Sequence, residues 1–166
     1  MPFSLYPAVM IDRLTDLEPD WLRQRRIELI LLDFDNTILP YTTSDPTPEM
    51  ADWLARMRRE GFPVCVVSNS RRDRVPQFCA AHGIDCVTGA GKPGTRGIRR
   101  ALEKYGCAPD RAVLAGDQIY TDVLGANRAG VVPVLVRPIS LHIFPLRLRN
   151  WAEQPWIQIA KRRLKS

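Results

Sequence analysis

Two carboxylates and a hydroxyl stand at the end of a largely apolar run of the sequence. The run covers residues 27–32, and Asp33, Asp35 and Thr37 follow it at every second position. Such a run is typical of a strand buried on both faces, and ligands of open parallel sheets bind just beyond the carboxyl ends of strands. Two carboxylates this close repel each other unless a cation or a shared proton lies between them. Mg²⁺ fits this role, because it binds through one or two carboxylates together with substrate phosphate.

Taken alone, the same string also fits a strand followed by an acidic turn, because Asp and Asn are common turn residues. The ends of the other predicted strands are therefore informative. Further polar side chains follow them, namely Ser68, Asn69, Lys92 in the glycine-rich loop 89–94, Asp117 and Asp122. Together the set offers a carboxylate nucleophile, an acid/base group, a lysine and a hydroxyl for phosphate charge, and carboxylates for a metal. Phosphoryl transfer from a monoester requires these groups.

Each of these residues also has a simpler structural role. Ser68 and Asp122 could cap helices, and Lys92 could be a solvated loop lysine. If these simpler roles were correct, independent polar residues would have to lie at one edge of one sheet, in chain order, by coincidence. We therefore prefer the joint functional interpretation.

Strands and helices are predicted to alternate along the middle of the chain. The predicted strands are 27–33, 62–68, 85–87, 112–116 and 131–136, and the predicted helices are 47–60, 71–81, 97–105 and 120–129. This alternation is typical of an α/β fold with right-handed crossovers. We expect a five-stranded, mostly parallel sheet flanked by helices, in a single domain 1–166 with its core at 27–136. Residues 1–26 form a lead-in, and residues 137–166 carry three prolines before a short basic helix.

The net charge of +6 lies in the C-terminal segment. Residues 1–136 contain 17 basic and 17 acidic side chains, whereas residues 137–166 contain seven basic side chains and one glutamate. Near an anionic leaflet each basic residue contributes about 1 kcal/mol, so the four basic residues of 161–165 favour peripheral membrane association. Nucleic acid is an alternative partner, and so is solvent alone. Trp156 and Ile159 could insert at a membrane interface or pack on the sheet.

The sequence shows no signal peptide and no run of about 18 apolar residues that could span a membrane. The four cysteines form no C-x-x-C pair, and we expect them to be reduced: Cys65, Cys79, Cys86 and Cys107. The two histidines lack ligand-like spacing, which argues against a zinc site. We therefore expect a cytoplasmic protein, located at the inner face of the membrane if the basic segment binds lipid.

The ordered motifs resemble those of the haloacid dehalogenase (HAD) superfamily. They are Asp33-x-Asp35-x-Thr37, Ser68, Lys92, and Asp117 with Asp122, and the match spans 27–136. More narrowly, the stretches 67–69, 91–93 and 116–128 look like the YqeG branch, which contains small class III phosphatases related to phosphatidylglycerophosphate phosphatases. Dehalogenases are similar but lack the second aspartate of the first motif, which is present here as Asp35.

This resemblance implies a Rossmann-like fold and a mechanism. Asp33 would attack phosphorus to form an aspartyl-phosphate, and Asp35 would act as the acid and base. Mg²⁺ would be held by the Asp33 carboxylate, the Asp35 main-chain carbonyl and Asp117. Asp122 would support the metal by contacting its direct ligands, or through a water molecule.

The resemblance also assigns the phosphate contacts. Ser68 and Lys92 would bind the transferring phosphoryl group, and Lys92 would also neutralise Asp33. Thr37 would orient the motif loop. Asn69 could touch phosphate or close the turn, and both roles stay open.

The spacing of the motifs leaves no room for a cap domain, which HAD enzymes usually insert after the first or second motif. Thirty-five positions separate Asp33 from Ser68, and 24 separate Ser68 from Lys92. An uncapped site would admit a bulky leaving group such as a lipid headgroup, a nucleic-acid end or a protein, or a second subunit could cover it.

Three functions are therefore considered. We expect a Mg²⁺-dependent phosphomonoester hydrolase, with phosphatidylglycerophosphate as the substrate that the resemblance suggests. The alternatives are a nucleotide or polynucleotide phosphatase, and a non-catalytic RNA- or ribosome-associated module with a HAD fold.

Overall fold

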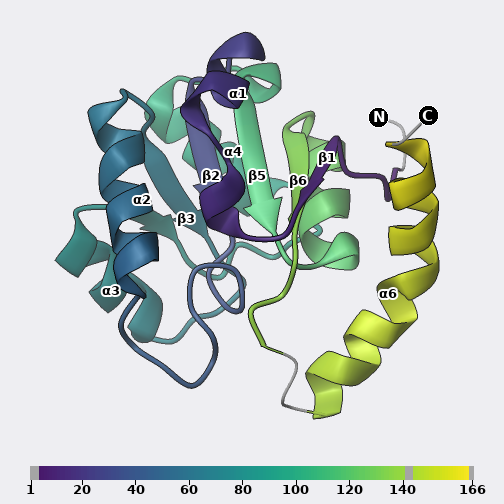
Figure 1. The fold of residues 1–166 in the computed structure, drawn as a ribbon. Helices are drawn as coiled ribbons and strands as arrows, with labels where there is room; N and C mark the ends of the chain where they lie inside the picture. Colours follow the sequence, from purple (N-terminus) through teal and green to yellow (C-terminus); the bar gives the residue numbers. More distant parts are fainter. Residues whose placement is uncertain (1–3, 141–143, 165–166) are drawn as a thin grey trace.

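The computed structural model describes residues 4–140 and 144–164, which form one open sheet with helices on both faces and along one edge (Figure 1). Six strands pair in parallel in the order β1-β6-β5-β2-β3-β4. The strands are β1 Val9–Ile11, β2 Leu29–Leu32, β3 Val64–Val67, β4 Asp85–Val87, β5 Ala112–Gly116 and β6 Val132–Val136. The helices are α1 Pro19–Gln24, α2 Pro48–Arg59, α3 Arg74–His82, α4 Arg96–Tyr105, α5 Leu124–Ala129 and α6 Phe144–Arg163.

The α/β fold with a parallel sheet is confirmed, but the prediction of five strands is wrong. The sixth strand, β1, lies within the predicted lead-in and pairs with β6, with Val9 opposite Val134. It was missed because it has three residues, all of them partly exposed, and such a run carries no clear hydrophobic period.

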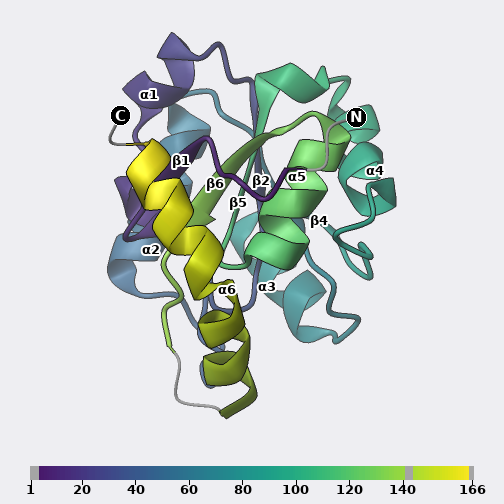
Figure 2. The ribbon, with the colours of Figure 1, turned by 90° about the vertical axis from the view of Figure 1, so that its right-hand side faces the viewer.

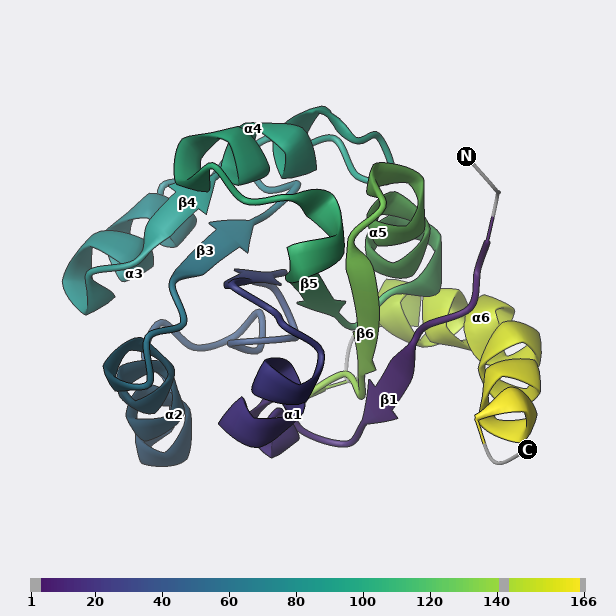
Figure 3. The ribbon, with the colours of Figure 1, turned by 90° about the horizontal axis from the view of Figure 1, so that it is seen from above.

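The central strand β2 owes its position to its apolar side chains. All four of its residues are fully buried, and they alternate between two hydrophobic clusters. Ile30 and Leu32 face the side covered by α1, α2 and α3, whereas Leu29 and Leu31 face α4 and α5 (Figure 3). This alternation is the two-residue period of a strand. The sheet is therefore the rigid middle layer of three.

The chain between the strands is short. From Asp33 to Ser68 it forms one loop, α2 and β3, and from Ser68 to Lys92 it forms α3, β4 and a loop. Thr47 caps α2 by accepting a hydrogen bond from Met50 N at 3.3 Å, and Pro48 occupies the first turn. The edge where the strands end is thus left without an inserted domain in these two segments.

The C-terminal segment differs from the prediction of a short helix after three prolines. Pro155 lies inside α6, a 20-residue helix that runs along the β1 and β6 edge of the sheet (Figures 1 and 2). Trp156 and Ile157 pack against the cluster of Leu5, Ile119, Val123, Leu124 and Leu135, so part of the segment belongs to the folded body. Ile159 is 39% exposed.

Parts of the predicted terminal segments, residues 1–3, 141–143 and 165–166 with Lys165, lie outside the described residues. Among the helices of the described part of the chain, none is long and apolar enough to cross a bilayer. All four cysteines are free, and Cys65 and Cys79 are buried.

Candidate active site

The carboxyl ends of β2, β3 and β5 lie level with one another, and the predicted site residues follow them. Leu32 pairs with Val66 on one side and with Ala115 on the other. Asp33, Ser68 and Asp117 therefore leave the sheet at the same edge. Lys92 joins them from the loop after β4, and Asp122 joins them from the π-helical turn Ile119–Val123. All five side chains are buried.

Lys92 links two of the carboxylates. Its Nζ donates a hydrogen bond of 2.8 Å to Asp33 Oδ1, and it lies 2.7 Å from Asp122 Oδ1 as an ion pair. The side chains of Lys92 and Asp122 are each 1% exposed. A buried charge is tolerated only when it is paired, so the three groups depend on one another.

The charges of this cluster oppose the effect of burial. Burial raises the pKa of Asp33 above its ordinary value, and the Lys92 ammonium opposes that shift. Burial alone would lower the pKa of Lys92, but the Asp122 and Asp33 carboxylates outweigh it and hold the pKa above its ordinary value. Lys92 is therefore a permanent cation against which Asp33 can stay ionised.

Gly116 allows Asp122 to approach the end of β5. A Cβ at this position would lie 2.4 Å from Asp122 Oδ2 and Cγ, so Asp122 would have to move away from the end of β5. Asp122 Oδ2 also accepts a hydrogen bond of 3.1 Å from Gln118 N. π-Helical turns are rare and occur often at functional sites. This turn directs Asp122 back toward the sheet instead of along a regular helix.

The cluster could hold a divalent cation. Asp33, Asp117 and Asp122 each offer a carboxylate oxygen, and these three oxygens lie within 4.8 Å of one another. Asp122 Oδ1 is buried, and the Lys92 ammonium lies 2.7 Å from it. An all-oxygen set of this kind suits Mg²⁺. Asp122 already faces Lys92 and Gln118 N, which fits the supporting role better than a direct one.

Asp35 stands apart from this cluster and is paired with Arg74 at the start of α3. The two side chains meet at 3.0 Å and are 20% and 23% exposed. Burial raises the pKa of Asp35 above its ordinary value, and Arg74 opposes the shift. Arg74 also lies 5.1 Å above the Phe34 ring and donates to Pro40 O at 2.6 Å. Arg74 was not predicted from the sequence, because nothing distinguishes it from its neighbours Arg71 and Arg72 before the fold is known.

Asn69 is engaged with the main chain of Lys92. Its Oδ1 accepts from Lys92 N at 2.7 Å, and its Nδ2 donates to Lys92 O at 2.9 Å. Both ends of the amide are thus used to hold the lysine loop, which favours the turn-closing alternative. Ser68 Oγ accepts from Ser70 N at 3.1 Å, and the contact of Ser68 with phosphate stays a prediction.

The loop after β2 is held by two further residues. Thr37 Oγ1 lies 3.5 Å from Asp33 Oδ2. Asn36 has a left-handed backbone with φ +67°. Its side chain donates to Ser140 O at 2.7 Å and accepts from Ser140 N at 2.9 Å. The sequence analysis assigned no role to Asn36, since its partner lies far away in the chain.

Comparisons with known proteins identify the family of the chain. The sequence model of the haloacid dehalogenase-like hydrolases matches residues 11–130. The chain is 31% identical over 158 residues to the probable phosphatase YqeG of Bacillus subtilis, covering 95% of this chain and 92% of that protein. It is 24% identical over 168 residues to phosphatidylglycerophosphate phosphatase 1 of Arabidopsis thaliana, covering 95% of this chain and 45% of that protein.

A solved structure shares the fold. The cobalt-bound deoxy-D-mannose-octulosonate 8-phosphate phosphatase of Haemophilus influenzae superposes with a TM-score of 0.55 at 13% identity, covering 68% of this chain and 69% of that chain. The chain therefore belongs to the haloacid dehalogenase-like hydrolase family, as a hydrolase of its phosphatase group.

Proposed function

We propose that the protein is a Mg²⁺-dependent phosphomonoester hydrolase that works through an aspartyl-phosphate on Asp33. The observation that carries this proposal is the buried cluster in which Lys92 pairs with Asp33 and Asp122 while Asp117 lies within 4.8 Å of both carboxylates. Such a cluster concentrates negative charge that a divalent cation would relieve, so that an anionic phosphate could approach Asp33.

In the first half of the reaction an Asp33 oxygen attacks phosphorus, and the bond between phosphorus and the leaving oxygen breaks. Asp35, whose pKa burial raises, gives its proton to that oxygen. Lys92 and Ser68 face the transferring phosphoryl group and compensate its charge.

In the second half, Asp35 takes a proton from a water molecule as the water oxygen attacks phosphorus. The bond between phosphorus and Asp33 then breaks, and inorganic phosphate leaves. Asp35 ends the cycle protonated and Asp33 ends it ionised, as both began. When bound by Asp33, the Asp35 carbonyl and Asp117, with Asp122 in support, Mg²⁺ supplies charge neutralisation for the incoming phosphate.

We further propose phosphatidylglycerophosphate as the substrate, which the resemblance and the Arabidopsis relative support. A peripheral position at an anionic membrane, through the basic residues of α6, fits this substrate. Nucleotide or polynucleotide ends are the competing substrates, and an inactive RNA-associated module is the competing function.

Phosphate release from a panel of lipid, nucleotide and sugar phosphates tests the proposal, with and without Mg²⁺. We expect turnover that stops in EDTA and returns with Mg²⁺, and Asp33→Asn should abolish it without loss of the fold. Comparable turnover by a well-folded Asp33→Asn variant would exclude Asp33 as the nucleophile. Release from none of the panel by the wild-type protein would favour the inactive module.

A further inference from the structure

A pocket lies between the start of α4 and the loop that leads from β4 to Lys92. It has a volume of about 350 Å³, and three arginines line it: Arg71 from the loop after β3, and Arg96 and Arg100 from α4. Its remaining lining residues belong to this loop and to the first turn of α4, and none of them is acidic. The pocket therefore gathers basic charge in the part of the chain whose overall charge is balanced.

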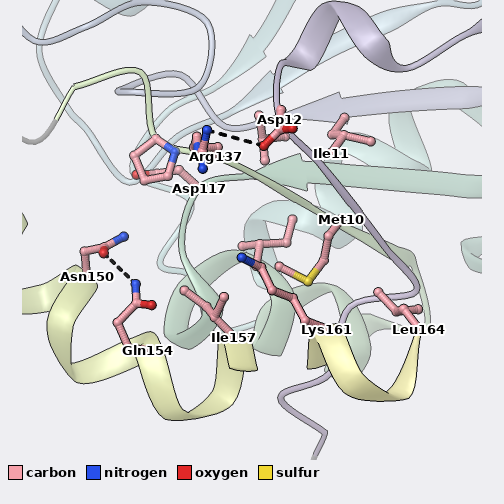
Figure 4. Close-up of a pocket in the computed structure, with 13 residues that line it drawn as sticks. Met10, Ile11, Asp12, Asp117, Arg137, Asn150, Gln154, Ile157, Lys161 and Leu164 are labelled. Atoms are coloured by element: carbon pink, nitrogen blue, oxygen red, sulfur yellow. Dashed lines mark hydrogen bonds and ion pairs between the residues drawn. The ribbon is translucent and has the colours of Figure 1, made fainter. Parts of the chain in front are cut away.

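The three arginines of this pocket have no acidic partner. Within residues 4–140 and 144–164, none of the three forms an ion pair with a carboxylate. The larger groove of about 760 Å³ between α6 and the edge of the sheet differs in this respect, because Arg137 faces Asp12 there at 3.6 Å and Asp117 lines it as well (Figure 4). The positive charge of the pocket at α4 is thus left for an anionic ligand to neutralise.

The start of α4 also carries charge of the unfavourable sign. Arg96 and Arg100 lie four positions apart, Arg99 lies between them in the sequence, and the first turn contains no acidic residue. Like charges at this spacing repel each other, and cations near a helix N-terminus oppose the helix dipole. A bound anion would relieve both effects. The sequence of α4 therefore fits a helix whose charge is balanced by a ligand.

Main-chain hydrogen bonds join the loop of the pocket to the elements around it. Ala90 N donates to Ser68 O at 2.9 Å, and Gly97 N donates to Ala90 O at 3.2 Å. Gly89 has a left-handed backbone with φ +57°, and a Cβ there would lie 3.3 Å from Arg71 Nε, so this glycine leaves room for the arginine side chain beside the loop. The main chain of the pocket is thus already in place, which lowers the free-energy cost of ordering it when a ligand binds.

We propose that this pocket binds the diphosphate group of a small molecule, at a site separate from the carboxylate cluster. The charge of three guanidinium groups exceeds that of a single phosphate, which is about −1.5 to −2 at pH 7. Guanidinium groups bind phosphate oxygens through paired hydrogen bonds. The pocket has the volume of about twelve water molecules at about 30 Å³ each, which is enough for a diphosphate. The proposal does not depend on the proposed function, because none of the lining residues belongs to the candidate active site.

Two matched pairs of variants test the pocket. Arg71→Gln is compared with Arg72→Gln, and Arg100→Gln is compared with Arg99→Gln. Each pair removes the same charge at neighbouring exposed positions, and only the first member of each pair lines the pocket. Inorganic diphosphate and ADP are titrated calorimetrically into the full chain and the four variants. EDTA is present so that Mg²⁺ neither binds the diphosphate nor supports turnover.

We expect Arg71→Gln and Arg100→Gln to weaken the binding of both ligands about tenfold, which corresponds to about 1.4 kcal/mol. The control variants should stay within about twofold at 0.15 M salt, because exposed charges outside the pocket are largely screened. Tighter binding of ADP than of inorganic diphosphate would support a nucleotide as the source of the group, and the reverse order would support the free anion. Equal losses within each pair, or no binding by the wild-type protein, would overturn the proposal.

Thermal unfolding separates a ligand site from a structural role of the arginines. Without ligand, the Tm of Arg100→Gln should equal or exceed that of the wild-type protein, because the substitution removes a like-charge repulsion. Inorganic diphosphate should raise the Tm of the wild-type protein and should raise that of Arg71→Gln/Arg100→Gln less. A Tm of ligand-free Arg100→Gln well below that of the wild-type protein would contradict the unpaired charge on which the proposal rests. If a single-stranded oligonucleotide binds through Arg71 and Arg100 while neither diphosphate does, the pocket is a nucleic-acid contact and the small-molecule ligand is wrong.

Discussion

Lys92 supplies the positive charge that the buried carboxylates of the site need. It is buried between Asp33 and Asp122, and neither carboxylate could remain ionised there without a cation. Asn69 holds the main chain of Lys92 at both ends, so the position of the ammonium is fixed before any ligand arrives. The site is thus prepared for a phosphate that brings further negative charge.

Lys92→Met should lower the free energy of unfolding by about 3–5 kcal/mol, because it leaves two buried carboxylates without their partner. Urea denaturation in EDTA measures the effect. The double variant Lys92→Met/Asp122→Asn should recover part of the loss, since it removes one of the unpaired charges. An unchanged stability of Lys92→Met would show that the ion pairs do not stabilise the fold.

Arg74 should set the upper pH limit of activity through Asp35. The Arg74 cation opposes the raised pKa of Asp35, so Arg74→Met should raise that pKa further. A general acid with a higher pKa stays protonated to higher pH, and the alkaline limb of kcat/KM should move to higher pH. Arg74→Lys keeps the charge and serves as the control. Movement of the limb to lower pH would contradict the role of Asp35 as the acid.

At the scale of elements, the π-helical turn Ile119–Val123 is held from two sides. Gly116 leaves room for Asp122 on one side, and the buried Glu153 of α6 accepts from Tyr120 N on the other. The second contact acts as a helix cap supplied by a different helix. Helix α6 therefore supports the turn that carries Asp122.

Glu153→Ala should lower the free energy of unfolding by about 1 kcal/mol, as the loss of a helix cap does, and it should weaken Mg²⁺ binding. Glu153→Gln keeps an oxygen acceptor and should bind Mg²⁺ nearly as the wild-type protein does. Calorimetric titration of Mg²⁺ distinguishes the two variants. Equal Mg²⁺ affinity for all three proteins would limit Glu153 to a purely structural role.

Elements with a clear local signal were predictable from the sequence. The predicted ranges 85–87 and 112–116 match β4 and β5, because each range has turn residues on both sides. The strand β1 and the long helix α6 were not predictable, since β1 depends on pairing with β6 and Pro155 normally ends a helix. Site residues that follow strands were found, whereas Arg74, Asn36 and Glu153 act through partners brought near only by the fold.

At the scale of the molecule, the charge and the exposed apolar side chains of α6 lie on the same element. Leu148 and Trp151 are 54% and 72% exposed, and Arg147, Lys161 and Arg162 are exposed on the same helix. A helix of this composition would suit the anionic membrane surface that we propose for the protein.

Binding to vesicles that contain anionic lipid should weaken steeply between 0.1 M and 1 M salt, because the Debye length falls from about 10 Å to about 3 Å. The variant Arg147→Glu/Arg162→Glu should lose this binding while keeping its rate on p-nitrophenyl phosphate. Sedimentation with vesicles measures the bound fraction, and vesicles of neutral lipid are the control. Retained binding by the variant would remove the electrostatic basis of membrane association.

The two hydrogen bonds between Asn36 and Ser140 have a consequence for biosynthesis. They join positions 104 residues apart, and the central strand β2 must likewise wait for β5 as its neighbour. At a synthesis rate of about 5–20 residues per second, the loop with Asp33 leaves the ribosome roughly 5–20 s before its anchor does. During that interval the nascent chain carries Asp33, the proposed nucleophile, without the contacts that position it. We therefore expect the newly made protein to hydrolyse phosphomonoesters only after Ser140 has left the ribosome and β6 has joined the sheet.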